Sequence, residues 1–180
     1  MPKLEKEKDL KTIIYQGNIN LGRGLEPVIK SLKFISEFKL IIIGGGRGLC
    51  ELKKISSSAG VDGRVDFKGR VPFSELKQYT QQATIGLLLE EPLGLSFKYS
   101  LPNKLFDYIH AEIPTLATPL FEVQKIINKY QVGDLLKNRN PKNIAKQILD
   151  ISLKLDKYNF KKAKIDFNWK NEEKVLKRIF

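Results

Sequence analysis

The sequence predicts an α/β fold, a Rossmann-like parallel sheet with helices on both faces. Short runs of β-branched and other apolar residues alternate with amphipathic stretches of helical length, which is the pattern of successive βαβ units. Two of the runs, residues 39–43 and 84–89, are apolar almost throughout, as is typical of parallel strands that are buried on both faces. The 180 residues suit one domain, and 42% of them are hydrophobic, enough for a core of its own.

The strands are assigned from β-branched and aliphatic runs that end at glycines or polar residues. They cover residues 12–15, 39–43, 64–67, 84–89 and 113–117. The helices are assigned from apolar residues that recur at spacings of three and four. They cover residues 25–34, 49–59, 74–82, 101–110 and 121–130, a stretch that begins with Pro141, and 166–180. Ser74 as a cap and Pro141 at a first helical position support two of these limits.

The composition indicates in which cellular compartment the protein is found. Cys50 is the only cysteine, which excludes an internal disulfide and a cysteine-based metal site and fits a reducing environment. No apolar stretch approaches the roughly 18 residues of a membrane-spanning helix, and residues 1–11 lack the apolar core of a signal peptide. We therefore expect a cytoplasmic protein with a single domain over residues 1–180, of which 1–10 form a flexible tail.

The chain is strongly basic, with 32 lysine and arginine residues against 20 aspartate and glutamate residues and a net charge of +12. Such a charge suits nucleic acid, an anionic membrane surface or a polyphosphate ligand. The basic residues are spread along the chain rather than clustered, so lysines on solvated helix faces explain the charge equally well.

Ligands of such sheets bind beyond the carboxyl ends of the strands, so the loops that follow strands hold the functional candidates. The first loop, residues 15–24, contains three glycines that let the backbone approach a ligand, and Arg23, which can bind a phosphate bidentately. An ordinary strand–helix turn would use the same glycines. The glycine-rich loop 44–48 lacks the spacing of a dinucleotide fingerprint and is expected only to line the cleft.

The segment 90–108 is the most informative. It leaves an apolar strand as a long polar loop and enters a helix whose first turn holds Asn103 and Lys104. A cation is unfavourable at a helix N-terminus, where the macrodipole is positive, so Lys104 indicates an anionic ligand with Asn103 as a further donor. Asp107 lies on the same helix face and can reach neighbouring hydroxyls. A lysine that points to solvent and pairs with Asp107 would explain the pattern equally well.

Residues 101–115, Leu-Pro-Asn-Lys-Leu-Phe-Asp-Tyr-Ile-His-Ala-Glu-Ile-Pro-Thr, resemble the signature of the group 1 (GT-B fold) glycosyltransferases. The strand and glycines 40–46, the segment 64–76, and Trp169 with the terminal helix are similar to other elements of that family, in the same order. The resemblance implies the C-terminal, donor-binding lobe of a two-lobed enzyme. Such an enzyme moves a sugar from a nucleotide diphosphate sugar to a hydroxyl acceptor in glycan or polysaccharide synthesis.

The resemblance also implies roles for particular residues. Those expected at the donor diphosphate are Gly17, Asn18, Arg23, Ser100, Leu101, Pro102, Asn103 and Lys104. The nucleobase would meet Lys68, Gly69 and Arg70, and the ribose hydroxyls would meet Asp107. Glu90 or Glu91 would touch the donor sugar. The resemblance implies no metal ion and no cofactor besides the donor substrate, and it implies an acceptor lobe, absent from this chain, that holds the catalytic base, so the isolated domain is expected to be inactive.

Four positions depart from the family pattern. Tyr99 and Asp107 occupy the places of two glutamates, and Asn18 occupies the place of a common basic residue. Glu112 stands where glycine is usual, at a helix end that often adopts left-handed backbone geometry. These departures indicate a distinct donor, weak activity or drift.

Three single residues are assigned structural roles: His110 near a helix C-terminus, Cys50 in packing, and Trp169 as the anchor of the last helix. Two other functions stay open, a sugar-nucleotide epimerase-like GT-B enzyme that needs no acceptor, and a non-enzymatic basic module for membrane or nucleic acid. The favoured function implies a nucleotide sugar and the missing lobe or a partner chain as partners, with an anionic membrane surface as a further candidate and no nucleic acid.

Overall fold

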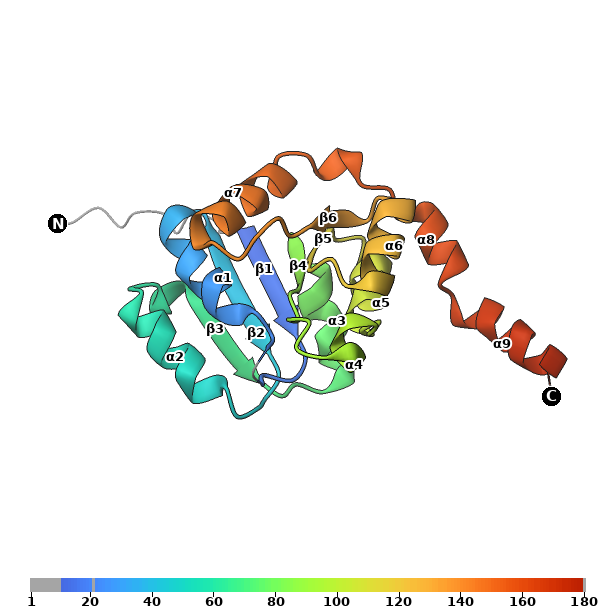
Figure 1. Cartoon of the computed structure of the whole chain (residues 1–180), viewed down its shortest axis with the longest axis horizontal. Helices are drawn as coiled ribbons and strands as arrows, with labels where there is room; N and C mark the ends of the chain where they lie inside the picture. The colour runs from blue at the N-terminus through green and yellow to red at the C-terminus, as the bar shows by residue number, and fades with distance from the viewer. Residues whose placement is uncertain (1–10, 21, 180) are drawn as a thin grey trace.

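A computed structural model describes residues 11–20 and 22–179, and the expected tail 1–10 lies outside them (Figure 1). Six strands form one parallel sheet in the order β3-β2-β1-β4-β5-β6. They are β1 (Lys11–Gln16), β2 (Phe38–Ile43), β3 (Val65–Gly69), β4 (Ile85–Leu88), β5 (Thr115–Ala117) and β6 (Gly133–Leu135). This is the doubly wound order, whose direction reverses between β1 and β4. The predicted fold class is confirmed.

Among the described residues, helices connect each strand to the next, with both α4 and α5 between β4 and β5, and three further helices follow β6. They are α1 (Leu25–Ser31), α2 (Leu49–Ser58), α3 (Phe73–Gln81), α4 (Leu95–Lys98), α5 (Lys104–Ala111), α6 (Phe121–Tyr130), α7 (Pro141–Ser152), α8 (Lys161–Asp166) and α9 (Trp169–Ile179), with short 3-10 turns η1 (Leu32–Phe34), η2 (Asp62–Arg64) and η3 (Leu155–Lys157). Helix α1 packs against α2 and α7, and α3 packs against α5. Figure 1 shows α9 extending away from the sheet at the end of the chain.

The two faces of the sheet are set by the alternation of side chains along each strand. In β1, Ile13 and Tyr15 belong to the large apolar cluster that includes Val28 of α1 and Ile148 of α7. Ile14, between them, packs in a second cluster with Tyr108 of α5. The strand is therefore buried on both faces, which explains the apolar run of its three central residues, Ile13 to Tyr15.

The structure corrects several predicted limits. The stretch 25–34 divides into α1 and η1, and the loop 90–100 contains the short helix α4. Pro72 rather than Ser74 precedes α3, and no side chain among the described residues caps that helix. The helix predicted from residue 101 begins only at Lys104, after a turn at Asn103. Strand β6 was not predicted, since its three residues include no β-branched side chain.

Two structural roles expected from the sequence are wrong. Trp169 opens α9 but is 70% exposed, so it does not anchor that helix to the sheet. Cys50 is exposed as well and contributes nothing to the core. The terminal helix expected over 166–180 begins at Trp169, after α8 ends at Asp166. Within residues 11–20 and 22–179, no helix has the length and apolar composition that crossing a bilayer requires.

Candidate functional site

The loops after β1 and β2 are joined by backbone contacts at the carboxyl edge of the sheet. The Gly17 amide donates to the Ile43 carbonyl at 2.9 Å, and the Ile19 amide donates to the Gly45 carbonyl at 3.0 Å. Gly44 has a φ of 138°, and a Cβ there would overlap the Gly17 carbonyl oxygen. Only glycine allows this approach, so the first predicted loop is held against the second.

A buried carboxylate stands at the centre of this edge. Glu90, two residues beyond the end of β4, is 0% exposed. Its Oε1 atom accepts hydrogen bonds from Lys104 Nζ at 2.5 Å and from Arg23 Nη1 at 3.3 Å. Its Oε2 atom and the Arg23 Nε atom are buried without a hydrogen-bond partner among the described residues. We call Arg23, Glu90 and Lys104 the charged cluster.

Lys104 enters this cluster from the first turn of α5. Its side chain is 10% exposed, and its Nζ atom lies 4.4 Å from the centroid of the Tyr15 ring. Burial lowers the pKa of Lys104, and the charge of Glu90 partly opposes that shift. Within the chain, Glu90 is therefore the anion that offsets a cation at a helix start. The alternative in which Lys104 points to solvent and pairs with Asp107 is wrong.

Arg139, which precedes α7, supports the strand end that holds Glu90. Its guanidinium donates to the carbonyl oxygens of Leu89 at 3.1 Å and Glu90 at 3.3 Å, and to Thr118 Oγ1 at 3.1 Å. It also lies 3.9 Å from the carboxylate of Glu91. Guanidinium groups suit such forked contacts, so Arg139 fixes the backbone from which the Glu90 side chain projects.

Asp107 belongs to a different group of side chains. Gln16 Nε2 donates to Asp107 Oδ2 at 2.7 Å, and Thr80 Oγ1 donates to Gln16 Oε1 at 2.8 Å. Burial raises the pKa of Asp107, while the hydrogen bond from Gln16 and the nearby His110 lower it. Asp107 and Gln16 line a cavity of about 540 Å³ between α3 and α5. Its other lining residues are Phe73, Ser74, Leu76, Lys77, Thr80, Gln81, His110, Ala111 and Lys164.

The segment before α5 presents its backbone rather than its side chains. Asn103 is the residue before the helix, and its side chain caps nothing. Ser100 donates its hydroxyl to the Phe97 carbonyl at 2.8 Å, and Leu101 is 38% exposed. The Pro102 carbonyl accepts from the Leu105 amide at 3.1 Å. The Phe106 and Asp107 amides likewise donate to the Asn103 carbonyl, so among the described backbone groups only the Asn103 and Lys104 amides at this helix start are left to meet an anion.

The predicted base-contacting residues lie along β3 and beyond it. The Gly69 carbonyl accepts from the Gly44 amide at 2.7 Å, which ties this segment to the glycine loop. A Cβ at Gly45 would lie 3.3 Å from Arg70 Nε, so Arg70 also faces that loop. Lys68 instead pairs with Asp66 at 2.7 Å. The structure therefore gathers Gly17, Arg23, Glu90 and Lys104, and leaves Lys68 apart from them.

Two further predicted residues occupy the loops around the charged cluster. The Asn18 carbonyl accepts from the Tyr15 hydroxyl at 2.8 Å, and burial raises the pKa of that hydroxyl. The Glu91 amide donates to the Gly22 carbonyl at 2.7 Å. Both residues thus serve to hold one loop in place, through backbone atoms.

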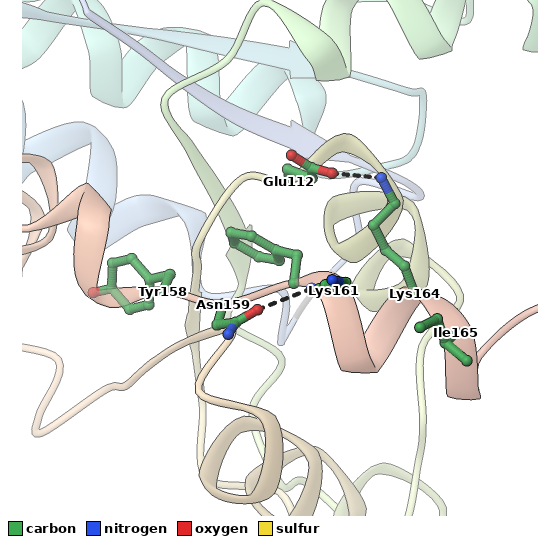
Figure 2. Close-up of a pocket in the computed structure, with 7 residues that line it drawn as sticks. Glu112, Tyr158, Asn159, Lys161, Lys164 and Ile165 are labelled. Atoms are coloured by element: carbon green, nitrogen blue, oxygen red, sulfur yellow. Dashed lines mark hydrogen bonds and ion pairs between the residues drawn. The ribbon is translucent and has the colours of Figure 1, made fainter.

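A separate hollow of about 550 Å³ lies where α8 packs against the end of α5 (Figure 2). Glu112 and Lys164 point toward each other across it and pair at 2.5 Å. Glu112 has a φ of 58°, the left-handed geometry expected at this helix end. His110 Nε2 donates to the Phe167 carbonyl at 2.8 Å close by, so His110 contributes to the attachment of the segment after α8. This hollow contains no residue predicted to bind the donor.

Known proteins place this arrangement in a family. The model for "Glycosyl transferases group 1" matches residues 1–163. The chain belongs to the group 1 glycosyltransferases. The resemblance found in the sequence is thereby confirmed, with Trp169 and the terminal helix outside the matched residues.

Individual glycosyltransferases are similar to this chain over aligned segments of different lengths. The GDP-Man:Man(3)GlcNAc(2)-PP-Dol alpha-1,2-mannosyltransferase of Xenopus laevis is 48% identical over 58 residues, which are 29% of this chain and 12% of that protein. Sucrose-phosphate synthase from Thermosynechococcus elongatus superposes with a TM-score of 0.74 at 18% identity, over 97% of this chain and 47% of that one. HepE of Anabaena, solved with UDP and glucose, superposes with a TM-score of 0.67 at 15% identity, over 83% and 40%. The chain spans less than half of each of these proteins, and the two superpositions confirm its fold.

Sequence reasoning missed four residues of this candidate site: Tyr15, Gln16, Thr80 and Arg139. Gln16 carried a usable signal, because a polar residue that ends an apolar strand must find hydrogen-bond partners. Arg139 carried none, since it lies 49 residues from the Glu90 carbonyl that it contacts. No group of three or more metal-ligating side chains occurs in the described part of the chain.

Proposed function

We propose that this chain is the donor-binding lobe of a glycosyltransferase and binds the diphosphate of a nucleotide sugar at the charged cluster. The observation that carries the proposal is the convergence of Arg23 and Lys104 on one oxygen of Glu90, beside Gly17 and the start of α5. Family membership supports the same edge of the sheet as the donor site.

The charges of the cluster suit such a ligand. Arg23 and Lys104 carry two positive charges and Glu90 one negative charge, so a net charge of about +1 is left at the cluster when Glu90 and Lys104 are both ionised. The N-terminus of α5 adds roughly half a positive charge. A diphosphate that reaches the charged cluster would offer Arg23 and Lys104 several oxygens in place of the single Glu90 oxygen that they share. The amides around Asn103 would donate to the same phosphate oxygens. No metal ion is needed in this scheme.

The remaining assignments extend the proposal outward from the diphosphate. Asp107 would accept hydrogen bonds from the ribose, and Arg70 with the backbone of Gly69 would border the base. Among the described residues, Glu90 Oε2 is buried without a hydrogen-bond partner, so it suits a sugar hydroxyl. The reaction would transfer the sugar to a hydroxyl of an acceptor held by another lobe. Lowering the barrier would then depend on stabilising the departing diphosphate.

The test is a calorimetric titration of the chain with UDP, GDP and ADP, each with and without EDTA. We expect one nucleotide to bind, and chelation to leave its affinity unchanged. Arg23→Ala and Lys104→Met should each weaken binding by about tenfold, the scale of one charge-assisted contact. Lys125→Ala on α6, which removes a surface pair with Glu122, is the matched control and should change nothing. Binding that is unaffected by both cluster variants would contradict the site.

We also propose a cytoplasmic location, with a basic surface that favours an anionic membrane carrying the acceptor. The net charge of +12 supports this. Sedimentation with vesicles of phosphatidylcholine and phosphatidylserine should show binding that rises with phosphatidylserine and falls with salt. If neutral vesicles sediment the same amount of protein, the preference for an anionic membrane is contradicted.

A separate assay tests the epimerase alternative. Conversion of the nucleotide sugar in the absence of any acceptor would support an epimerase.

A further inference from the structure

Gln16 is a buried polar residue that directly follows the apolar run Ile13 to Tyr15 of β1. It closes β1 and is 4% exposed. A buried amide needs partners, and Gln16 finds them on two different helices. Its Nε2 atom donates to Asp107 Oδ2 of α5 at 2.7 Å, and its Oε1 atom accepts from Thr80 Oγ1 of α3 at 2.8 Å. The amide therefore joins the sheet to both walls of the cavity between α3 and α5.

The hydrogen bonds that link Thr80, Gln16 and Asp107 can run in only one direction when Asp107 is ionised. A carboxylate only accepts, so the NH2 group of Gln16 must face it and the amide oxygen must face Thr80. Thr80 Oγ1 lies 2.8 Å from the Leu76 carbonyl oxygen as well. Its single hydrogen is then donated to Gln16 Oε1. The opposite orientation would bring the amide oxygen to 2.7 Å from Asp107 Oδ2, which requires a protonated carboxyl.

We propose that Gln16 is a positioning residue that orients Asp107 for hydroxyl groups of the ligand's ribose. It holds Oδ2 against the sheet and leaves Oδ1 to accept a hydrogen bond from the ligand. Asp107 is shorter than glutamate and has two side-chain torsions, so fixing one oxygen defines the direction of the other. The inference rests on the proposed function, because it assumes a nucleotide in this cleft.

The electrostatic role of Gln16 agrees with this. Burial raises the pKa of Asp107, and the Gln16 hydrogen bond opposes the rise. The same contact that orients the carboxylate therefore favours its ionised form, which accepts hydrogen bonds. The other titratable side chains among the described residues that line the cavity are His110 on α5, Lys77 on α3 and Lys164 on α8.

The first experiment compares ribose recognition in the parent chain and in Gln16→Met, which keeps the side-chain length but cannot donate. The probes are whichever of UDP, GDP and ADP binds, together with its 2′-deoxy and 3′-deoxy forms. The parent should bind the ribonucleotide more tightly than at least one deoxy form. Gln16→Met should lose about tenfold in ribonucleotide affinity and change deoxy binding less than twofold. Gln78→Met, an exposed glutamine of α3, is the matched control and should behave as the parent does.

The second experiment measures the carboxyl pKa of Asp107 by NMR before any nucleotide is added. We expect a higher pKa in Gln16→Met and a smaller rise in Thr80→Val, which removes only the hydroxyl that donates to the amide oxygen of Gln16. Gln16→Glu places two carboxylates together, so its ribonucleotide affinity should recover as pH falls and they share a proton. Thr80→Val carries the binding test as well if Gln16→Met does not fold.

The outcomes separate the two proposals. If the parent binds none of the three nucleotides, the proposed function is overturned and this inference with it. If the parent binds one but ignores the ribose hydroxyls, or if Gln16→Met keeps both the parent's discrimination and its Asp107 pKa, only the role of Gln16 is overturned. Loss of discrimination together with a raised pKa supports it.

Discussion

Glu90 and Lys104 form an ion pair at 2.5 Å in which the carboxylate is fully buried. The pair joins the end of β4 to the first turn of α5, and it offsets the unfavourable position of a cation at a helix start. Burying the Glu90 carboxylate costs solvation free energy, so the ion pair stabilises the fold only when both charged side chains are present.

Removing Glu90 should therefore destabilise the fold. Glu90→Gln leaves Lys104 largely buried without its counter-charge, and we expect a loss of about 3 kcal/mol in the free energy of unfolding. Lys104→Met should cost less, because Arg23 still pairs with Glu90. Urea denaturation of both single variants and the double variant checks this. The double variant should be at least about 1 kcal/mol more stable than the sum of the two effects predicts; strict additivity would show that the two side chains are not coupled.

Arg139 should tolerate replacement poorly even by another cation. Arg139→Lys cannot serve the Leu89 and Glu90 carbonyls and Thr118 together, because an ammonium lacks the planar fork. We expect a loss of about 1–2 kcal/mol in the free energy of unfolding, as for one or two buried carbonyls left unpaired. The exposed Arg47→Lys should stay within about 0.5 kcal/mol of the parent. Equal effects of the two changes in thermal denaturation would refute the structural role of Arg139.

Glu112 allows backbone strain and an ion pair to be separated. Its φ of 58° is unfavourable for a residue with a side chain, by about 1 kcal/mol. Its pair with Lys164 is partly exposed and contributes less than that. Glu112→Gly should thus raise the free energy of unfolding by about 0.5 kcal/mol, whereas Glu112→Ala, which keeps the strain and loses the pair, should lower it by a few tenths. If Glu112→Gly melts at a lower temperature than Glu112→Ala, backbone strain at this position does not determine the relative stability of the two variants.

Asp107 should make stability depend on pH in the acidic range. Its pKa in the folded chain is raised above 3.8, so the folded state holds the proton more tightly than the unfolded state does. The protonated group favours folding at low pH, and this contribution fades as pH rises through the folded pKa. Asp107→Asn, which still accepts from Gln16, should melt about 1–3 °C above the parent at pH 7. The difference should disappear near pH 3.5; a difference that is constant with pH would exclude the carboxyl as its cause.

Local patterns in the sequence were enough for the fold class and for most elements. Helical spacing located α1, α2, α6 and α7, and continuous apolar runs located the strands that are buried on both faces, because each pattern reflects which sides of an element meet the core. The resemblance in residues 101–115 led to the family. The short elements α4 and β6 escaped, since three or four residues contain too little periodicity to be recognised.

The sequence by itself thus determined a doubly wound domain of a glycosyltransferase and the loops where its chemistry should lie. Only the tertiary structure decided which side chains meet in those loops. Arg23 and Glu90 are 67 residues apart, and Gln16 and Asp107 are 91 apart. These contacts arise because β1 lies beside β4 in the sheet, and that neighbourhood is set by the packing of the whole core rather than by any local period.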